Sequence, residues 1–227
     1  MKKLPIFHVI FPTRQAMNLA MGRVSEYNEN PVLARRVFTW DELNAWWRTT
    51  SHGKRTAFID YWDGFNIPVA EFKPLLDGRF ADLNAEERAL LRTVRRLPKD
   101  ACVISTAVDV PDTLSHEVVH GLYAHLPKYR RAVGDAVRAA MRKNAVANII
   151  AALRNMGYGA QTFVNEINAY LVTKVEPGER MYGPGERELR RELLRILRAH
   201  LGYDLRGARG HARAAALVHD VRFSSRA

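Results

Sequence analysis

Residues 116–120 read HEVVH and place two histidines and a glutamate at a spacing that can do metal chemistry. In a helix, residues four apart lie on one face, so His116 and His120 can direct ring nitrogens toward one ion. Glu117 is offset by about 100° and stands beside that ion, where it can accept a proton from an attacking water. The spacing predicts two metal ligands and a general base. The alternative is an ordinary helix in which both histidines only satisfy hydrogen bonds.

A third ligand has to come from another part of the chain. In one extended form of the motif, H-E-x-x-H-x-x-G-x-x-H, a third histidine follows on the same segment. This chain does not have that form, because Tyr123 and Leu126 occupy the positions of the glycine and the third histidine. Residues 136–165 contain no acidic side chain, and then Glu166 follows. Burying a bare carboxylate is costly, so Glu166 needs a metal ion, an arginine or solvent as its partner. It shares a predicted helical face with Phe163, Ala169 and Tyr170.

The segments HEVVH (116–120) and NEINAY (165–170) together resemble the gluzincin branch of the zincin metallopeptidases. The resemblance covers residues 110–173. It implies that zinc is held by His116, His120 and Glu166 on a zincin-like active-site helix and a later helix. It also implies that Glu117 is the catalytic base and that the substrate is a peptide or protein.

The chain departs from the gluzincin pattern at two places. The 45 residues between His120 and Glu166 make a long gap, and Ala169 and Tyr170 stand where thermolysin-like enzymes have Ser and Asp. The usual acidic group that orients the first zinc histidine is thus missing there. Tyr170 is predicted either to contact one of the metal ligands or to contact the tetrahedral oxyanion that forms during hydrolysis. For the oxyanion contact the alternatives are Tyr182, His200 or an arginine.

The charge balance bears on partners. A net charge of +11 over 227 residues is common in proteins that meet nucleic acid or another anionic surface. The basic excess is spread along the chain, without a run of five like charges, and much of it is arginine interleaved with glutamate. Nucleic acid is therefore an alternative partner that the sequence does not favour.

Cysteine use and hydropathy bear on the compartment. Cys102 is the only cysteine, which excludes an intrachain disulfide and a Cys-ligated zinc knuckle. A lone thiol in an apolar segment is typical of a buried side chain and of a reducing compartment. No apolar run reaches 18 residues, so no transmembrane helix is expected. We expect a cytoplasmic protein without membrane association, and the sequence does not indicate an oligomeric state.

The fold class predicted from the pattern is α+β. Segments 5–11, 56–62 and 101–108 predict about three strands, followed by a mainly helical C-terminal half from residue 111. Capping signals predict helix starts after Thr13, Thr39 and Asn84. The clearest amphipathic helix has the apolar stripe Leu189, Leu193, Leu194, Leu197 and Leu201.

We predict one zincin-like domain over 1–227, in which 111–227 carries the metal site and 1–110 forms a pocket wall or a substrate edge. Strand 101–108 is either an edge strand that aligns an extended substrate or an ordinary core strand. The aromatic stretch 61–66 either lines a pocket or packs beneath a turn.

These features predict a zinc-dependent hydrolase, most simply a metallopeptidase, with Zn²⁺ as its cofactor. Two alternatives remain. Two histidines and one carboxylate also suit iron(II) chemistry in a non-peptidase metal enzyme. The basic composition suits a nucleic-acid-associated protein.

Overall fold

The computed structural model describes residues 3–30, 32–110, 113–173 and 183–224. Contacts between residues divide the chain into two compact units, which we call the sheet unit (1–114 with 218–227) and the helical unit (115–217). The predicted change of character near residue 110 lies close to this division. Whether the two units make up the single domain predicted for 1–227 stays a prediction.

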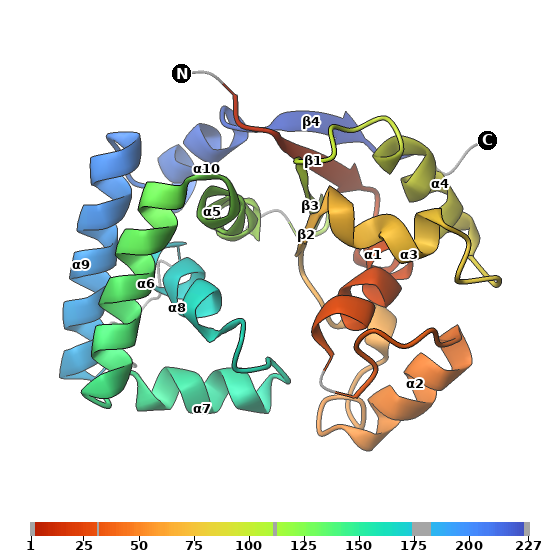
Figure 1. The fold of residues 1–227 in the computed structure, drawn as a ribbon, viewed down its shortest axis with the longest axis horizontal. Helices are drawn as coiled ribbons and strands as arrows, with labels where there is room; N and C mark the ends of the chain where they lie inside the picture. The colour runs from red at the N-terminus through yellow and green to blue at the C-terminus, as the bar shows by residue number, and fades with distance from the viewer. Residues whose placement is uncertain (1–2, 31, 111–112, 174–182, 225–227) are drawn as a thin grey trace. The chain divides into compact units, whose positions relative to one another are not determined.

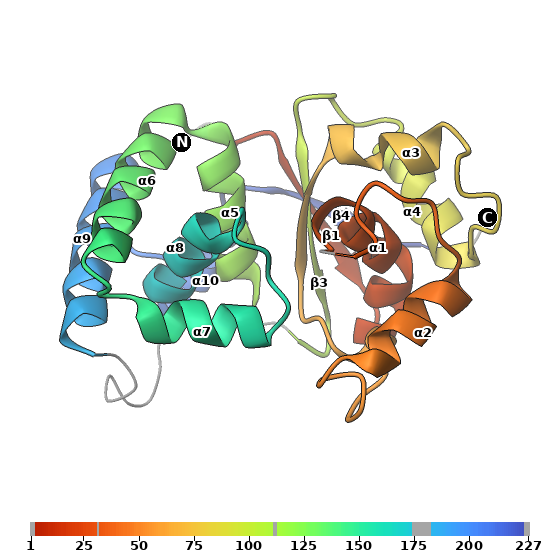
Figure 2. The same cartoon turned by 60° about the horizontal axis from the view of Figure 1, so that its bottom comes forward.

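The predicted α+β class is confirmed, because the described residues combine a small four-stranded sheet with mainly helical structure (Figures 1 and 2). The strand order is β2-β3-β1-β4, in which β1 is parallel to both β3 and β4, and β2 is antiparallel to β3. The strands are β1 (Ile6–Phe11), β2 (Phe65–Pro68), β3 (Cys102–Ala107) and β4 (His219–Arg222).

Side-chain caps start the longer helices of the sheet unit where the sequence predicts them. Thr13 accepts from the backbone N–H of Ala16, and Thr39 and Asn84 each form a reciprocal capping box with a glutamate three residues later. These are α1 (Arg14–Glu29), α2 (Trp40–Thr49) and α4 (Ala85–Val94), beside the short α3 (Lys73–Leu76), η1 (Phe58–Asp60) and η2 (Val69–Phe72).

One sheet face and helices α1 and α4 enclose the core of the sheet unit, which includes Val9, Phe11 and Val103. A buried ion pair joins the two helices. The guanidinium of Arg23 donates to both carboxylate oxygens of Glu87 at 2.7 Å, and both side chains are fully buried. Arg23 also donates to Asp82 at 2.6 Å, so its buried charge is matched by two carboxylates.

Three strand predictions need correction. The segment 56–62 is not a strand: it contains the 3-10 turn η1, and the strand β2 lies in the stretch predicted as a turn. Tyr61 packs against Trp47 and Trp62 with ring centroids 4.8 Å apart, and this packing overrides the local β propensity. The aromatic stretch 61–66 therefore packs onto the core of the sheet unit.

Strand β3 is not an edge strand. It pairs with β1 on one side and β2 on the other, and all six of its residues are buried. Its backbone cannot add an extended substrate within this sheet, so the edge-strand alternative for 101–108 is excluded and the other alternative, an ordinary core strand, is the one observed. Cys102 on β3 is buried, as predicted. The fourth strand, β4, was missed because the C-terminal half was predicted to be mainly helical and no strand was expected there.

The helical unit contains α5 (Leu114–His125), α6 (Pro127–Arg142), α7 (Ala147–Asn155), α8 (Phe163–Thr173), α9 (Pro184–Leu201) and α10 (Gly207–Ala215). Helices α6, α8 and α9 pack against one another, and α7 packs on α8. Figures 1 and 2 show α6 and α9 side by side. The leucine stripe predicted for α9 is buried at all five positions.

Glycine ends α9 as expected for a left-handed cap, since Gly202 has φ of 79°. None of the helices, within the residues described, is long and apolar enough to cross a membrane.

Candidate metal centre

Helix α5 presents His116 and His120 on one face, as their spacing requires. Val118, Val119 and Leu122 on the same helix are fully buried. Nε2 of His116 and Nε2 of His120 lie 3.1 Å apart, and the rings meet edge to face with centroids 4.7 Å apart. His120 is buried, and the His116 side chain is 16% exposed.

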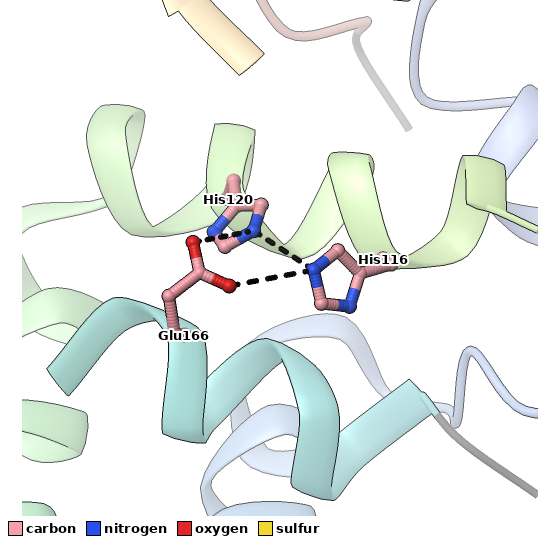
Figure 3. A group of neighbouring side chains, drawn as sticks. All are labelled: His116, His120 and Glu166. Atoms are coloured by element: carbon pink, nitrogen blue, oxygen red, sulfur yellow. Dashed lines mark hydrogen bonds and ion pairs between the residues drawn. The ribbon is translucent and has the colours of Figure 1, made fainter. Parts of the chain in front are cut away.

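Helix α8 brings Glu166 to the same point from the other side (Figure 3). Its Oε1 lies 3.5 Å from Nε2 of His120, and its Oε2 lies 3.7 Å from Nε2 of His116. Buried Phe163 and Ala169 lie on the same face of α8, as the sequence predicts. The structure thus brings together the three side chains predicted as ligands, although 45 residues separate His120 from Glu166.

The spacing of these atoms fits a metal ion. A tetrahedral zinc with ligand bonds of about 2.0–2.1 Å separates its ligand atoms by about 3.3–3.4 Å. The distance between the two ring nitrogens, and the distance from each nitrogen to one of the two carboxylate oxygens, are close to this value. Oε2 of Glu166 is buried and has no hydrogen-bond partner among the described residues. A buried carboxylate oxygen without a donor is costly unless a cation completes its surroundings. Two imidazoles and one carboxylate are also ligands that zinc accepts.

Electrostatics keep Glu166 ionised. Burial by itself raises the pKa of the Glu166 carboxyl, but the neighbouring His120 and His116 outweigh burial and lower the pKa below its ordinary value of 4.5. At neutral pH the site therefore offers a carboxylate anion together with two imidazoles.

Glu117 follows His116 on α5 and is buried. It is not one of the three clustered ligand residues, which agrees with its 100° offset around the helix. The charges of Glu166 and Glu117 both contribute to raising the pKa of Tyr158. Both carboxylates therefore lie within electrostatic range of the Tyr158 phenol. Glu117 is the chain neighbour of the first candidate ligand and is not itself in the cluster.

Tyr170 lies against the first histidine. Its ring centroid is 4.7 Å from that of His116, at an interplanar angle of 66°, and its hydroxyl donates to Sδ of Met156 at 3.9 Å. At the place where gluzincins have an acidic group that orients the first histidine, this structure has a ring contact from Tyr170. On the second histidine, Nδ1 of His120 has no hydrogen-bond partner within the described parts of the chain.

Tyr158 is a site residue that the sequence analysis missed. It follows Gly157, whose φ of 93° is a left-handed conformation that favours glycine, and this turn ends α7 before α8 begins. Burial, then the charges of Glu166, Tyr170 and Glu117, and a side-chain hydrogen bond with Tyr170 raise the pKa of Tyr158 well above 10. Its phenol stays protonated and is a hydrogen-bond donor at neutral pH.

The other residues considered for the site lie elsewhere or outside the described residues. Nδ1 of His200 contacts the carbonyl oxygen of Ile196 on its own helix at 2.8 Å. His125 is not part of the ligand cluster. Tyr182 falls outside the described residues. Among the described residues, the candidate site therefore consists of His116, Glu117, His120, Glu166 and Tyr170, as predicted, with Tyr158 as an added candidate.

Comparisons with protein-family models, with curated proteins and with solved structures found no match to this chain. The resemblance to gluzincins thus rests on the two motifs and on the site geometry alone. The function has to be argued from the side chains themselves.

Proposed function

We propose that this protein is a zinc-dependent hydrolase that cleaves peptide bonds. The observation that carries the proposal is the convergence of His116, His120 and Glu166 in a buried site, with Oε2 of Glu166 lacking a hydrogen-bond donor in the described structure. His116 and His120 would hold the ion through Nε2, and Glu166 through its carboxylate. Bound zinc supplies a Lewis acid that polarises a carbonyl group and acidifies water.

The remaining chemistry belongs to the protein's own groups. Glu117 accepts a proton from the attacking water and passes it to the leaving amine, which requires a carboxylate beside the ligand cluster and not in it. The phenol of Tyr158 donates a hydrogen bond to the oxygen on which negative charge develops. Its raised pKa keeps the proton on that phenol. Tyr170 fills the space beside the His116 ring, and in the absence of substrate it accepts the hydrogen bond of the Tyr158 phenol.

Zinc analysis with a matched control tests the metal site. After incubation with zinc and desalting, the wild type should hold about one zinc per chain. His116→Ala should lose most of it. His125→Ala removes an imidazole from the same helix but outside the cluster, and it should retain zinc like the wild type. Equal zinc contents in the two variants, or a wild type without zinc, would contradict the proposed ligands.

Glu117→Gln tests the hydrolase. The substitution keeps the size of the side chain but removes the proton acceptor, so turnover of a mixed peptide library should fall by about 10²–10⁴-fold while zinc stays bound. Turnover equal to wild type would show that Glu117 is not the base. If the wild type binds zinc but cleaves no peptide, the metal site stands and the peptidase assignment fails. In that case loading with iron(II) and measuring oxygen consumption tests the other chemistry of a two-histidine, one-carboxylate site.

A further inference from the structure

The net positive charge of the chain is concentrated in one of its two units, because that unit has fewer acidic side chains. The helical unit has 17 basic and 9 acidic side chains, a net charge of +8, whereas the sheet unit has 18 and 15, a net charge of +3. Three of the nine acids in the helical unit, Glu117, Glu166 and Glu186, are buried. The outer surface of the helical unit is therefore strongly positive.

Helix α6 gathers part of this charge into a row. Lys128, Arg131, Asp135, Arg138 and Arg142 follow one another at intervals of three or four residues and are all exposed, so they lie on one face of the helix. The opposite face holds the buried residues Tyr129, Val133, Val137 and Ala140. We call the row Lys128, Arg131, Arg138 and Arg142 the α6 ridge. At a rise of 1.5 Å per residue it is about 21 Å long.

The carboxylate of Asp135 neutralises only part of the positive charge of the α6 ridge. Asp135 pairs with Arg138 at 2.9 Å, and both side chains are exposed. Within the described residues, Lys128, Arg131 and Arg142 make no ion pair with a carboxylate. Exposed cations that are held close together on a rigid helix repel one another, and an anionic partner relieves that repulsion.

The neighbouring helix α9 carries a second row of cations. Arg187, Arg191, Arg195 and Arg198 are exposed along one face, and α9 packs directly on α6. Two of these arginines are paired with carboxylates: Arg195 with Glu192 at 2.6 Å, and Arg198 with Asp204 at 2.7 Å. The α6 ridge is therefore the more available of the two rows.

We propose that the α6 ridge binds the phosphate backbone of a nucleic acid. A row of four positive charges about 21 Å long on one rigid helix can contact several phosphates of a polymer whose negative charges repeat about one per 3.4 Å of helix axis on each strand of a duplex. Arginine supplies three of the four ridge cations, and its planar guanidinium pairs with phosphate oxygens in two-pronged fashion. This activity is independent of the proposed hydrolase site, because none of the ridge residues is a ligand or the base.

A nucleic acid fits this surface better than a membrane does. Helices that bind anionic membranes need large apolar side chains exposed beside the cations. Among the described residues the exposed large hydrophobic side chains are Val32, Val37 and Val108, and all three belong to the sheet unit. The α6 ridge thus has charge without an apolar surface that could insert between lipids.

The test uses the full chain with zinc added and two labelled probes, a DNA duplex of about 20 base pairs and an RNA strand of similar length. Fluorescence anisotropy should detect binding to at least one probe near 50 mM salt. With about four phosphate contacts, affinity should be roughly 10²-fold weaker near 200 mM salt. Failure to bind either probe at the lower salt concentration would overturn the proposal.

A matched pair of charge reversals locates the binding surface. Arg131→Glu/Arg142→Glu should weaken binding at least about tenfold and reduce the slope of log Kd against log salt by about two. Arg92→Glu/Arg96→Glu changes the net charge equally on exposed positions at the end of α4 in the sheet unit, and it should weaken binding less than about threefold. Circular dichroism checks that both variants are folded, and Arg131→Ala/Arg142→Ala provides a milder form of the first.

The outcomes separate the explanations. Equal losses in both charge-reversal variants would mean that overall charge and not the α6 ridge attracts the probe, and the proposal would be wrong. Tighter, ridge-dependent binding to vesicles that contain phosphatidylserine than to either nucleic acid would also overturn it, in favour of a membrane. Probe binding should not depend on the proposed metal site. His116→Ala should therefore bind both probes like the wild type, even though it should lose zinc.

Discussion

Nε2 of His116 and Nε2 of His120 face each other across 3.1 Å in a buried site. Two imidazole lone pairs repel at this distance, so either one ring donates its proton to the other or a cation lies between them. The carboxylate of Glu166 is within 3.7 Å of both rings and adds negative charge. The three proposed ligands are therefore already close together, and a proton competes with the proposed metal for the same nitrogens.

Zinc affinity should fall as the pH drops through the range in which imidazoles protonate, ordinarily near 6.5, because a protonated ring cannot be a ligand. The lowered pKa of Glu166 keeps its carboxylate ionised through this range, so the loss should follow the histidines. Competition against a zinc-binding dye between about pH 5 and pH 8 measures the affinity. An affinity that does not change over this range would argue against ligation by His116 and His120.

Tyr158→Phe should lower peptide turnover by about 10²-fold without loss of zinc, because it removes one hydrogen-bond donor aimed at developing negative charge. Tyr203→Phe is the matched control: Tyr203 lies in the same unit, where Arg213 stacks over its ring at 4.8 Å, and its hydroxyl has no part in the proposed site. The control should turn over substrate like the wild type. A Tyr158→Phe enzyme with unchanged kcat would remove Tyr158 from the mechanism.

Arg23→Met should destabilise the fold by about 3–5 kcal/mol, because Glu87 is then left buried without its partner. The double variant Arg23→Met/Glu87→Met removes both charges and should recover much of the loss. Arg92→Met, at an exposed position on α4, should change the free energy of unfolding by less than about 0.5 kcal/mol. Urea denaturation measures all three, and a double variant no more stable than Arg23→Met would contradict the ion-pair argument.

Glu26 should make the protein less stable as the pH rises. Burial raises the pKa of its carboxyl from the ordinary 4.5 to about 7, although hydrogen bonds from Asn30 and Trp62 lower it in part. Between these two values the folded chain holds the proton more often than the unfolded chain does. The free energy of unfolding therefore declines as the pH rises from about 4.5 through 7, by up to about 3 kcal/mol from this group.

Glu26→Gln should remove this pH-dependent component. The free energy of unfolding of the variant minus that of the wild type should therefore increase from about pH 4.5 to pH 7. Glu29→Gln changes an exposed carboxyl on the same helix and is the control. Urea denaturation at several pH values gives the comparison. A stability difference that stays constant with pH would mean that Glu26 titrates normally in the folded protein.

Local signals account for the parts of the fold that were predicted correctly. The capping boxes at Thr39 and Asn84 are completed by glutamates three residues later, and a cap depends on only a few neighbouring residues. The pair His116 and His120 has the same local character, since helical geometry alone puts both on one face. Glu166 could be selected because it is the first acid after a stretch of 30 residues without one.

The parts that were missed depend on distant contacts. Strand β4 is four residues long and pairs with β1, more than 200 residues earlier in the chain, so its own sequence carries little strand signal. Tyr158 lies in a turn between two helices, and only the packing of α7 and α8 brings its phenol to Glu166 and Glu117. Strand β2 was misplaced because aromatic packing around Tyr61 outweighs local propensity.

The pairing of β4 with β1 determines when the sheet can be completed during synthesis of the chain. A ribosome completes β1, β2 and β3 first, then the whole of 115–217, and β4 only afterwards. Until then β1 has an unpaired side, and an unpaired strand edge can associate with other chains. The helical unit, which holds all the proposed ligands, is continuous in sequence and can fold before β4 emerges. During synthesis, the candidate metal site can therefore form while the sheet is still incomplete.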